Sequence, residues 1–94
     1  MEHIEELKDR WIMLVDVRTG DLLKLSSEYD EDSALGPEYV LIVRVQEKRA
    51  EGLWSLSWFS CRDNKLEDIT LETRYVRHSC FSYGRIVSRT KAET

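Results

Sequence analysis

The stretch EGLWSLSWFSCRDNK, residues 51–65, carries two tryptophans four positions apart and ends in a polar turn. Because alternate residues of a strand share a face, a strand over residues 53–62 has one wholly apolar face, made by Trp54, Leu56 and Trp58. The opposite face is mixed, since it carries two serines. We predict that the tryptophan face is the core face and that Trp58 is buried. Of the aromatic residues, Trp54, close to the hairpin end, is the one that we expect to be partly exposed.

Residues 39–45, Tyr-Val-Leu-Ile-Val-Arg-Val, form the clearest strand and precede this stretch. The polar residues 46–52 turn the chain, so the two strands are predicted to make a hairpin. Cross-strand pairing would lay an apolar face of the first strand beside the tryptophans. That predicted face consists of Tyr39, Leu41, Val43 and Val45.

Further short strands are predicted on both sides of the hairpin. They comprise residues 22–25, 66–73, 75–81 and 85–88, separated by turns at 18–21, 63–64 and 82–84. Polar and apolar residues alternate over 66–73, which predicts a strand with one solvent-exposed face. Several short strands in a small domain indicate an antiparallel sheet that closes, or nearly closes, to hide its edges.

The N-terminus, residues 2–10, is predicted to form a short helix. Acidic residues crowd its first turn, and Lys8 and Arg10 lie in its last turn, which complements the helix dipole. The apolar run at residues 11–17 fits either a continuation of this helix or a buried strand, and we expect a strand from about Met13.

The 94 residues are predicted to form one mostly-β domain. The expected fold is a small antiparallel barrel or a strongly bent sheet of five to six strands over residues 12–89, with the short N-terminal helix and a tail at 90–94. No apolar run reaches the ~20 residues that cross a bilayer, and the acidic start lacks the apolar segment of a signal peptide. We therefore expect no membrane association and a cytoplasmic location, where both cysteines stay reduced.

Charge is unevenly distributed, although the net charge is only −4. Residues 1–72 hold nine Lys or Arg against seventeen Asp or Glu, whereas residues 73–92 hold five bases and no acid. Two interpretations of the basic C-terminal part stay open: it complements acidic strands within the fold, or it forms a patch for a partner. Nucleic-acid-binding domains are usually basic overall, which favours the first interpretation.

The longest polar stretch, residues 26–38, contains five acids, no base and the only proline. Loops of this length are often functional, and this one lacks the spacing and central glycine of a calcium loop. We therefore predict a protein-interaction module whose partner and oligomeric state stay open. Its predicted binding residues are Glu28, Tyr29, Asp30, Glu31, Asp32 and Trp54.

The alternative prediction is a small barrel that binds single-stranded nucleic acid. Arginines would contact phosphates, and tyrosines would stack on bases. The residues concerned are Arg74, Arg77, Arg85, Arg89, Tyr75 and Tyr83. The negative net charge disfavours this alternative, because it repels polyanions at long range.

Catalytic and cofactor motifs are not recognisable in the sequence. A metal could be held by His3, Cys61, His78 and Cys80, but structural zinc sites normally show paired close spacings. A Cys–His nucleophile pair would need an orienting group, and the four isolated glycines form no phosphate loop. We therefore predict a protein that is not an enzyme and has no catalytic residue, metal or cofactor.

The order of these features resembles the small SH3-like barrel proteins encoded in tailed-phage genomes. The resemblance extends over residues 17–72 and rests on the turn and strand at 19–25, the apolar strand at 40–45, and Trp58 ahead of the turn at 63–64. It implies an SH3-like barrel and a phage accessory protein that binds a host or viral protein in the host cytoplasm. The Ala-Leu-Tyr-Asp-Tyr-like motif of peptide-binding SH3 domains is absent, so binding of proline-rich peptides is not implied.

Overall fold

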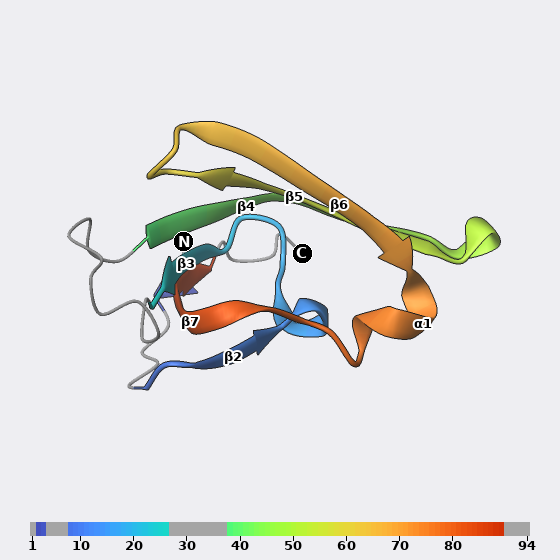
Figure 1. Cartoon of the computed structure of the whole chain (residues 1–94), viewed down its shortest axis with the longest axis horizontal. Helices are drawn as coiled ribbons and strands as arrows, with labels where there is room; N and C mark the ends of the chain where they lie inside the picture. The colour runs from blue at the N-terminus through green and yellow to red at the C-terminus, as the bar shows by residue number, and fades with distance from the viewer. Residues whose placement is uncertain (1, 4–7, 27–37, 90–94) are drawn as a thin grey trace.

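The computed structural model describes residues 2–3, 8–26 and 38–89 of the chain. Its main element is one antiparallel sheet, in which the two-residue strand β1 joins six longer strands (Figure 1). The strands are β1 (Glu2–His3), β2 (Arg10–Met13), β3 (Leu22–Leu25), β4 (Glu38–Lys48), β5 (Leu53–Ser60), β6 (Lys65–Glu72) and β7 (Cys80–Arg89). The other elements are α1 (Thr73–Val76) and the 3-10 turns Leu14–Asp16 and Arg49–Glu51. None of the helices in these ranges is long enough to cross a membrane.

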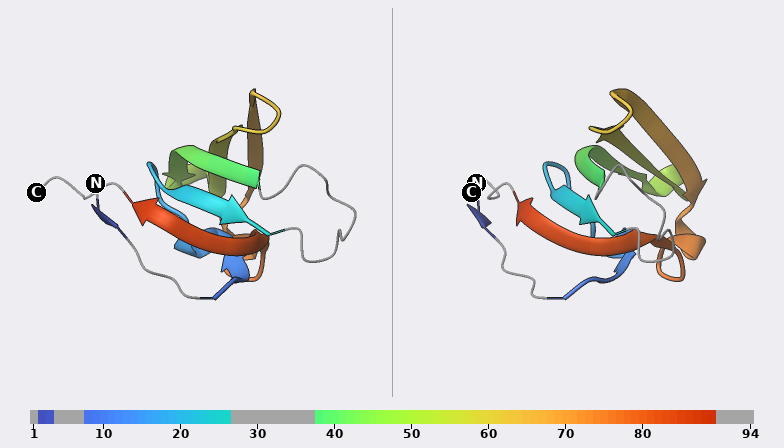
Figure 2. Two further views of the ribbon diagram at one scale, coloured as in Figure 1. Left: turned by 90° about the vertical axis from the view of Figure 1, so that its left-hand side faces the viewer. Right: turned by 60° about the vertical axis from the view of Figure 1, so that its left-hand side comes forward.

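The strands follow the order β1-β7-β3-β4-β5-β6, and β2 pairs with β7 on the side of β1. The sheet bends so that β5 and β6 lie across from β7 and β2 (Figures 1 and 2). The mostly-β class and five to six strands of appreciable length are confirmed. The closed barrel is wrong: within the described ranges β6 pairs with β5 alone, because the chain continues from β6 into α1.

The hydrophobic core lies inside the bend. Its ten buried residues are Ile12, Leu14, Val17, Leu23, Val40, Ile42, Trp54, Leu56, Val76 and Ile86. The tryptophan face of β5 points into this core, as predicted. The expected ranking of the tryptophans is wrong, because Trp54 is only 7% exposed while Trp58 is partly buried. Trp54 lies near the start of β5, where α1 packs against that strand and the Thr73 N–H donates to the Gly52 carbonyl at 2.8 Å.

The first half of β4 turns the opposite face to the core from the one predicted. The buried residues there are Val40 and Ile42. Tyr39, Leu41 and Val43, which were expected in the core, are 39–43% exposed. The outer face of β4 is therefore as apolar as its inner face, and hydrophobicity alone does not distinguish the two.

A β-bulge explains why one face cannot be followed along the whole of β4. It lies between Ile42, which is opposite Trp58, and Arg44, which is opposite Ser57. A bulge adds one residue to one strand and thereby exchanges its two faces. Val45, beyond the bulge, packs against the core as predicted.

The predicted N-terminal helix is wrong. Glu2–His3 and Arg10–Met13 are strands that pair with β7, and residues 4–7 lie outside the described ranges. A short isolated helix is marginal in water, whereas pairing with β7 satisfies the same backbone groups within a sheet. The apolar run begins as strand and continues as a 3-10 turn, so Met13 ends a strand instead of starting one.

One long strand, β7, takes the place of the two predicted C-terminal strands. The strand expected over residues 75–81 is wrong, because the chain forms α1 and a turn before Cys80. The strand expected over 85–88 is part of β7, which also runs through the predicted turn at 82–84. Gly84 serves close packing there, since a Cβ at this position would press on the backbone of Lys24 and Leu25 in β3.

Other local predictions are confirmed. Strand β3 has the expected bounds, and Asn64 adopts the left-handed backbone (φ 52°) in the polar turn between β5 and β6. Strand β6 has one wet face, as its alternation indicates: Leu66, Asp68, Thr70 and Glu72 are exposed, whereas Glu67, Ile69 and Leu71 are partly buried.

Candidate functional site

A groove of about 260 Å³ opens inside the bend of the sheet. We call it the seam groove, because it lies between β6 and β7, on the side where the sheet stays open. Residues from the first 3-10 turn and from five strands line it: Leu14, Leu25, Glu38, Val40, Trp58, Ile69, Cys80, Phe81 and Ser82. Six of these nine side chains are aliphatic or aromatic, so the groove presents mainly apolar surface.

Two aromatic rings meet in the wall of the seam groove. Trp58 and Phe81 pack edge to face, with centroids 5.1 Å apart and an interplanar angle of 89°. This is a preferred geometry for aromatic pairs and holds both rings in place. Together with Ile69, they pack against the core and still keep part of their surface exposed. That remaining surface is available to the side chains of a partner.

The polar residues of the groove are few and defined. The carboxylate of Glu38 accepts a hydrogen bond from the hydroxyl of buried Ser60 at 2.7 Å. Cys80 contributes an exposed free thiol. One anchored carboxylate in a mainly apolar groove can orient a bound segment that carries a positive charge.

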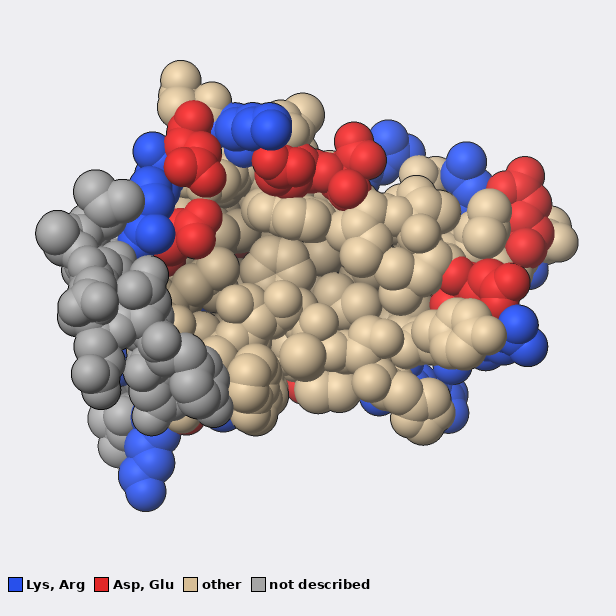
Figure 3. Space-filling model, in the orientation of Figure 1, with Lys and Arg blue, Asp and Glu red and all other residues tan. Residues whose placement is uncertain are grey.

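Strand β6, which lines the groove with Ile69, is the last strand of the sheet, so one of its backbone edges is left without a described partner strand. Such an edge is a template on which another chain can add a strand. β6 carries three carboxylates and one lysine: Glu67, Asp68, Glu72 and Lys65. Figure 3 shows an uncharged surface between β6 and β7, with acidic groups along its β6 side.

The predicted protein-binding residues are Glu28, Tyr29, Asp30, Glu31, Asp32 and Trp54. The first five lie outside the described ranges. Trp54 is buried and does not line the seam groove, so its burial does not favour a direct contact with a partner. The groove is nevertheless next to the acidic segment along the chain, because Leu25 and Glu38 both line it and residues 26–37 connect them.

Two of the predicted nucleic-acid-binding arginines lie at α1. Arg74 donates to the Glu72 carboxylate at 2.6 Å, and its guanidinium lies 4.8 Å from the centre of the Tyr75 ring. Arg77 and Tyr75 are both exposed. The charge of Arg74 is thus partly neutralised by a neighbour in the chain.

The other two predicted arginines lie on β7. Arg85 is 3.9 Å from the carboxylate of Asp9. Tyr83 packs edge-on against Trp11, with ring centroids 5.1 Å apart, so its ring is engaged within the fold. Arg89 belongs to the most buried ion pair of the described residues, which sequence analysis missed.

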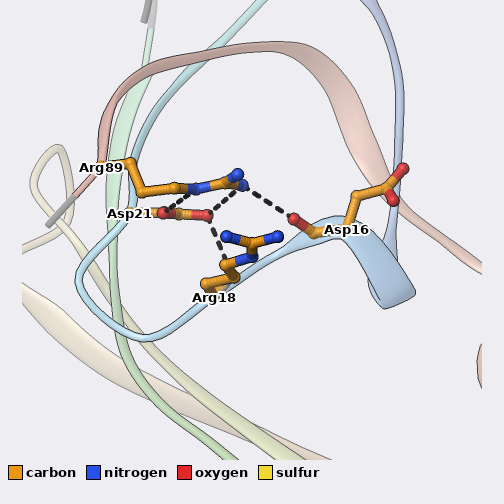
Figure 4. Close-up of polar contacts among 4 residues, drawn as sticks. All are labelled: Asp16, Arg18, Asp21 and Arg89. Carbon is orange, nitrogen blue, oxygen red and sulfur yellow. Dashed lines mark hydrogen bonds and ion pairs between the residues drawn. The ribbon is translucent and has the colours of Figure 1, made fainter. Parts of the chain in front are cut away.

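Arg89 and Asp21 join segments 68 residues apart (Figure 4). Arg89 Nε donates to Asp21 Oδ1 at 2.8 Å and Arg89 Nη2 to Asp21 Oδ2 at 3.0 Å, while the Asp21 side chain is 0% exposed. The Arg18 N–H also donates to Oδ2 at 2.9 Å, and Arg89 Nη2 donates to the Asp16 carbonyl at 3.0 Å. This corner complements charge within the fold, which is the first of the two interpretations of the basic C-terminal part.

The residues considered for a metal site do not form one cluster of described side chains. His78 and Cys80 were predicted to share a strand face. This prediction is wrong, because His78 lies in the turn after α1. Cys61 and Cys80 are exposed free thiols. Among the side chains that the structure describes, no group of three His, Cys, Asp or Glu could hold a metal ion.

The seam groove itself was not found from the sequence. The alternation over residues 66–73 correctly placed Ile69 on the drier face of β6, and the tryptophan pattern placed Trp58 on the core face. Phe81 was assigned to a strand with no known neighbour, and no local pattern shows that β6 ends the sheet.

No family model matches the chain, and neither the curated proteins nor the solved structures contain a significant match. Function is therefore inferred from the geometry of the described residues.

Proposed function

We propose that this protein is a non-enzymatic protein-interaction module that binds an extended segment of a partner in the seam groove. The observation that carries the proposal is the combination of a half-buried apolar groove with the open edge of β6 beside it. Strand addition supplies affinity through backbone hydrogen bonds, and the groove supplies specificity for alternate side chains.

The chemistry of the groove indicates what kind of segment fits. Apolar or aromatic side chains at alternate positions would contact Trp58, Ile69 and Phe81. Lysine or arginine at the positions between them would face the carboxylates of β6 and Glu38. Charges at the rim of an interface speed association and select the partner more than they add affinity.

The acidic residues 28–32 extend this charge pattern along the chain. They belong to the segment that joins Leu25 to Glu38, two residues of the groove. We infer that they attract a basic partner toward the groove, with Tyr29 as an additional contact. The proposed location is the cytoplasm. It is the host cytoplasm if the chain is a phage accessory protein of the SH3-like kind. The proposed binding needs no cofactor.

Nucleic-acid binding is the less favoured alternative. Arg74, Arg85 and Arg89 each lie within 4.0 Å of a carboxylate oxygen, which weakens the positive field that a phosphate backbone would meet. The net charge of −4 acts in the same direction.

Two cysteines allow a direct test with a matched control. The test begins with selection of binders from a random linear peptide library on the unmodified protein. In the Cys61→Ser variant, a bulky maleimide on Cys80 should abolish binding of these peptides, because Cys80 lines the groove. In the Cys80→Ser variant, the same reagent on Cys61 should leave binding unchanged, because Cys61 is exposed outside the groove.

The sequences of the selected peptides test the proposed chemistry separately. We expect apolar residues at alternate positions, interleaved with Lys or Arg. Peptides that still bind after Cys80 is blocked would place the site elsewhere. A library that yields no binders, together with tight binding of single-stranded DNA, would favour the nucleic-acid alternative.

A further inference from the structure

A second hollow, of about 250 Å³, lies beside the Asp21–Arg89 ion pair. It is separate from the seam groove and shares no lining residue with it. Its lining residues are Arg10, Val15, Asp16, Arg18, Ile86 and Arg89. Three of these six are arginines, and they come from three separate segments: β2, the turn before β3, and the end of β7.

The described side chains at this hollow include more guanidinium groups than carboxylates, although the protein as a whole is acidic. Arg10 lies 3.7 Å from the carboxylate of Asp16, and Asp21 binds Arg89 from within the fold. Among the described side chains at the hollow, three guanidinium groups stand against two carboxylates. Figure 4 shows the Asp16 carboxylate turned away from the Asp21–Arg89 pair and the Arg18 guanidinium folded back toward it.

The guanidinium of Arg89 and the backbone of Arg18 are held in place before any ligand arrives. Asp21 and the Asp16 carbonyl fix the guanidinium of Arg89, and Asp21 also fixes the backbone of Arg18. A planar guanidinium in a fixed position matches the oxygens of a phosphate in two-pronged geometry. Guanidinium groups that line one small hollow repel each other, and an anion between them removes that repulsion.

We propose that this hollow is a binding site for a compact phosphate-type dianion, either free phosphate or the phosphate monoester of a small molecule. Arg18 is its main contact, supported by Arg10 and Arg89. The site is independent of the proposed peptide groove, so each can be tested without the other. The net charge of −4 repels a long polyanion more strongly than a compact dianion, which favours the dianion as the ligand.

The test measures binding of inorganic phosphate to the full chain by calorimetry, with chloride at equal ionic strength as the reference. A ligand that binds only the folded state raises the melting temperature by mass action, so phosphate should also raise Tm. Arg18→Gln should weaken phosphate binding about tenfold, which corresponds to about 1.4 kcal/mol. Its Tm without phosphate should stay unchanged, because the residue is exposed and its backbone hydrogen bond to Asp21 is retained.

Two further variants give effects of known sign. Asp16→Asn should strengthen phosphate binding, because it removes a negative charge from the lining. Arg44→Gln, an exposed arginine outside the hollow, should leave binding unchanged. Phosphoserine serves as a second probe: binding tighter than that of phosphate assigns the site to a monoester, and equal binding assigns it to the phosphate group alone.

Three results would overturn the proposal. They are the absence of phosphate binding, binding that Arg18→Gln leaves unchanged, and binding that Arg44→Gln weakens as much as Arg18→Gln does. An oligonucleotide that binds through Arg18 when phosphate does not would also overturn it, in favour of a nucleic-acid site.

Discussion

The Asp21–Arg89 corner and the seam groove are two regions of the bent sheet that differ in how they are closed. At the corner, the end of β7 is joined to the turn before β3 by a buried ion pair whose carboxylate accepts three hydrogen bonds. At the groove, no strand completes the edge of β6 among the described residues, and aromatic side chains stay partly exposed. The corner joins polar groups within the fold, whereas the groove leaves apolar surface exposed, which suits the groove to the apolar side chains of a peptide.

The largest effect is expected at the closed corner. Arg89→Met should lower the free energy of unfolding by about 3–5 kcal/mol, because it leaves the carboxylate of Asp21 buried without its counter-charge. Urea denaturation measures this loss. Arg74→Met is the matched control: its ion pair with Glu72 is exposed, and such pairs contribute about 0–1 kcal/mol. Equal losses in the two variants would mean that the corner does not anchor the fold.

The second prediction compares the tryptophans of β5. Trp54→Ala should cost about 3–5 kcal/mol of stability, as truncation of a buried aromatic does. Trp58→Ala should cost less, because its ring borders the groove, and it should weaken peptide binding. A greater stability loss for Trp58→Ala would show that Trp58 is the principal core residue and that the groove is filled in solution.

The tryptophan pattern shows how far sequence reasoning reaches in this protein. Strict alternation over one unbroken strand identified the core face of β5 and the wet face of β6. The same rule failed on β4, because the bulge at Val43 exchanges the two faces of the strand. No residue type at this position indicates a bulge. Alternation identifies the core face of a strand only while the strand keeps a constant register with its partner. The partner strand sets that register.

Errors at the two ends of the chain have a related cause. The N-terminal segment has helical charge placement, yet its described parts pair with β7, and a partner more than seventy residues away leaves no local trace. Gly84 and its neighbours have turn composition, yet they lie inside β7 because β3 passes close by. Asp21 is likewise a typical turn residue whose counter-charge is remote. The groove and the ion pair both arise from such long-range contacts, so composition alone could not predict them.

The third prediction separates two reasons for glycine. Gly84→Ala should destabilise the fold by about 1–3 kcal/mol, because its Cβ would displace the backbone of β3. Gly52 has a left-handed backbone (φ 67°) and open space around it, so Gly52→Asn should change the free energy of unfolding little. Thermal denaturation of the two variants measures both effects. A neutral Gly84→Ala would show that β3 and β7 can move apart to accept the added Cβ.

The smallest effect on stability is expected from the acidic segment, where the effect on binding should be specific. Replacing Glu28, Asp30, Glu31 and Asp32 with Gln and Asn should leave the unfolding free energy nearly unchanged, because solvated charges contribute little. If these residues attract a basic partner, association of a selected peptide should slow, with dissociation nearly unaffected. The slowing should shrink at about 1 M salt, where screening acts within about 3 Å.

Stopped-flow measurements at low and high salt, on the wild type and on this four-residue variant, test that expectation. Neutral substitutions at Asp16, Glu47, Glu51 and Asp63, four exposed acids that do not line the seam groove, provide a charge-matched comparison. An equal slowing in both variants would attribute the effect to net charge rather than to residues 28–32. If the four-residue variant instead binds single-stranded DNA more tightly, through Arg74, Arg77 and Arg85, the acidic residues shield a nucleic-acid surface, and the protein-interaction proposal is wrong.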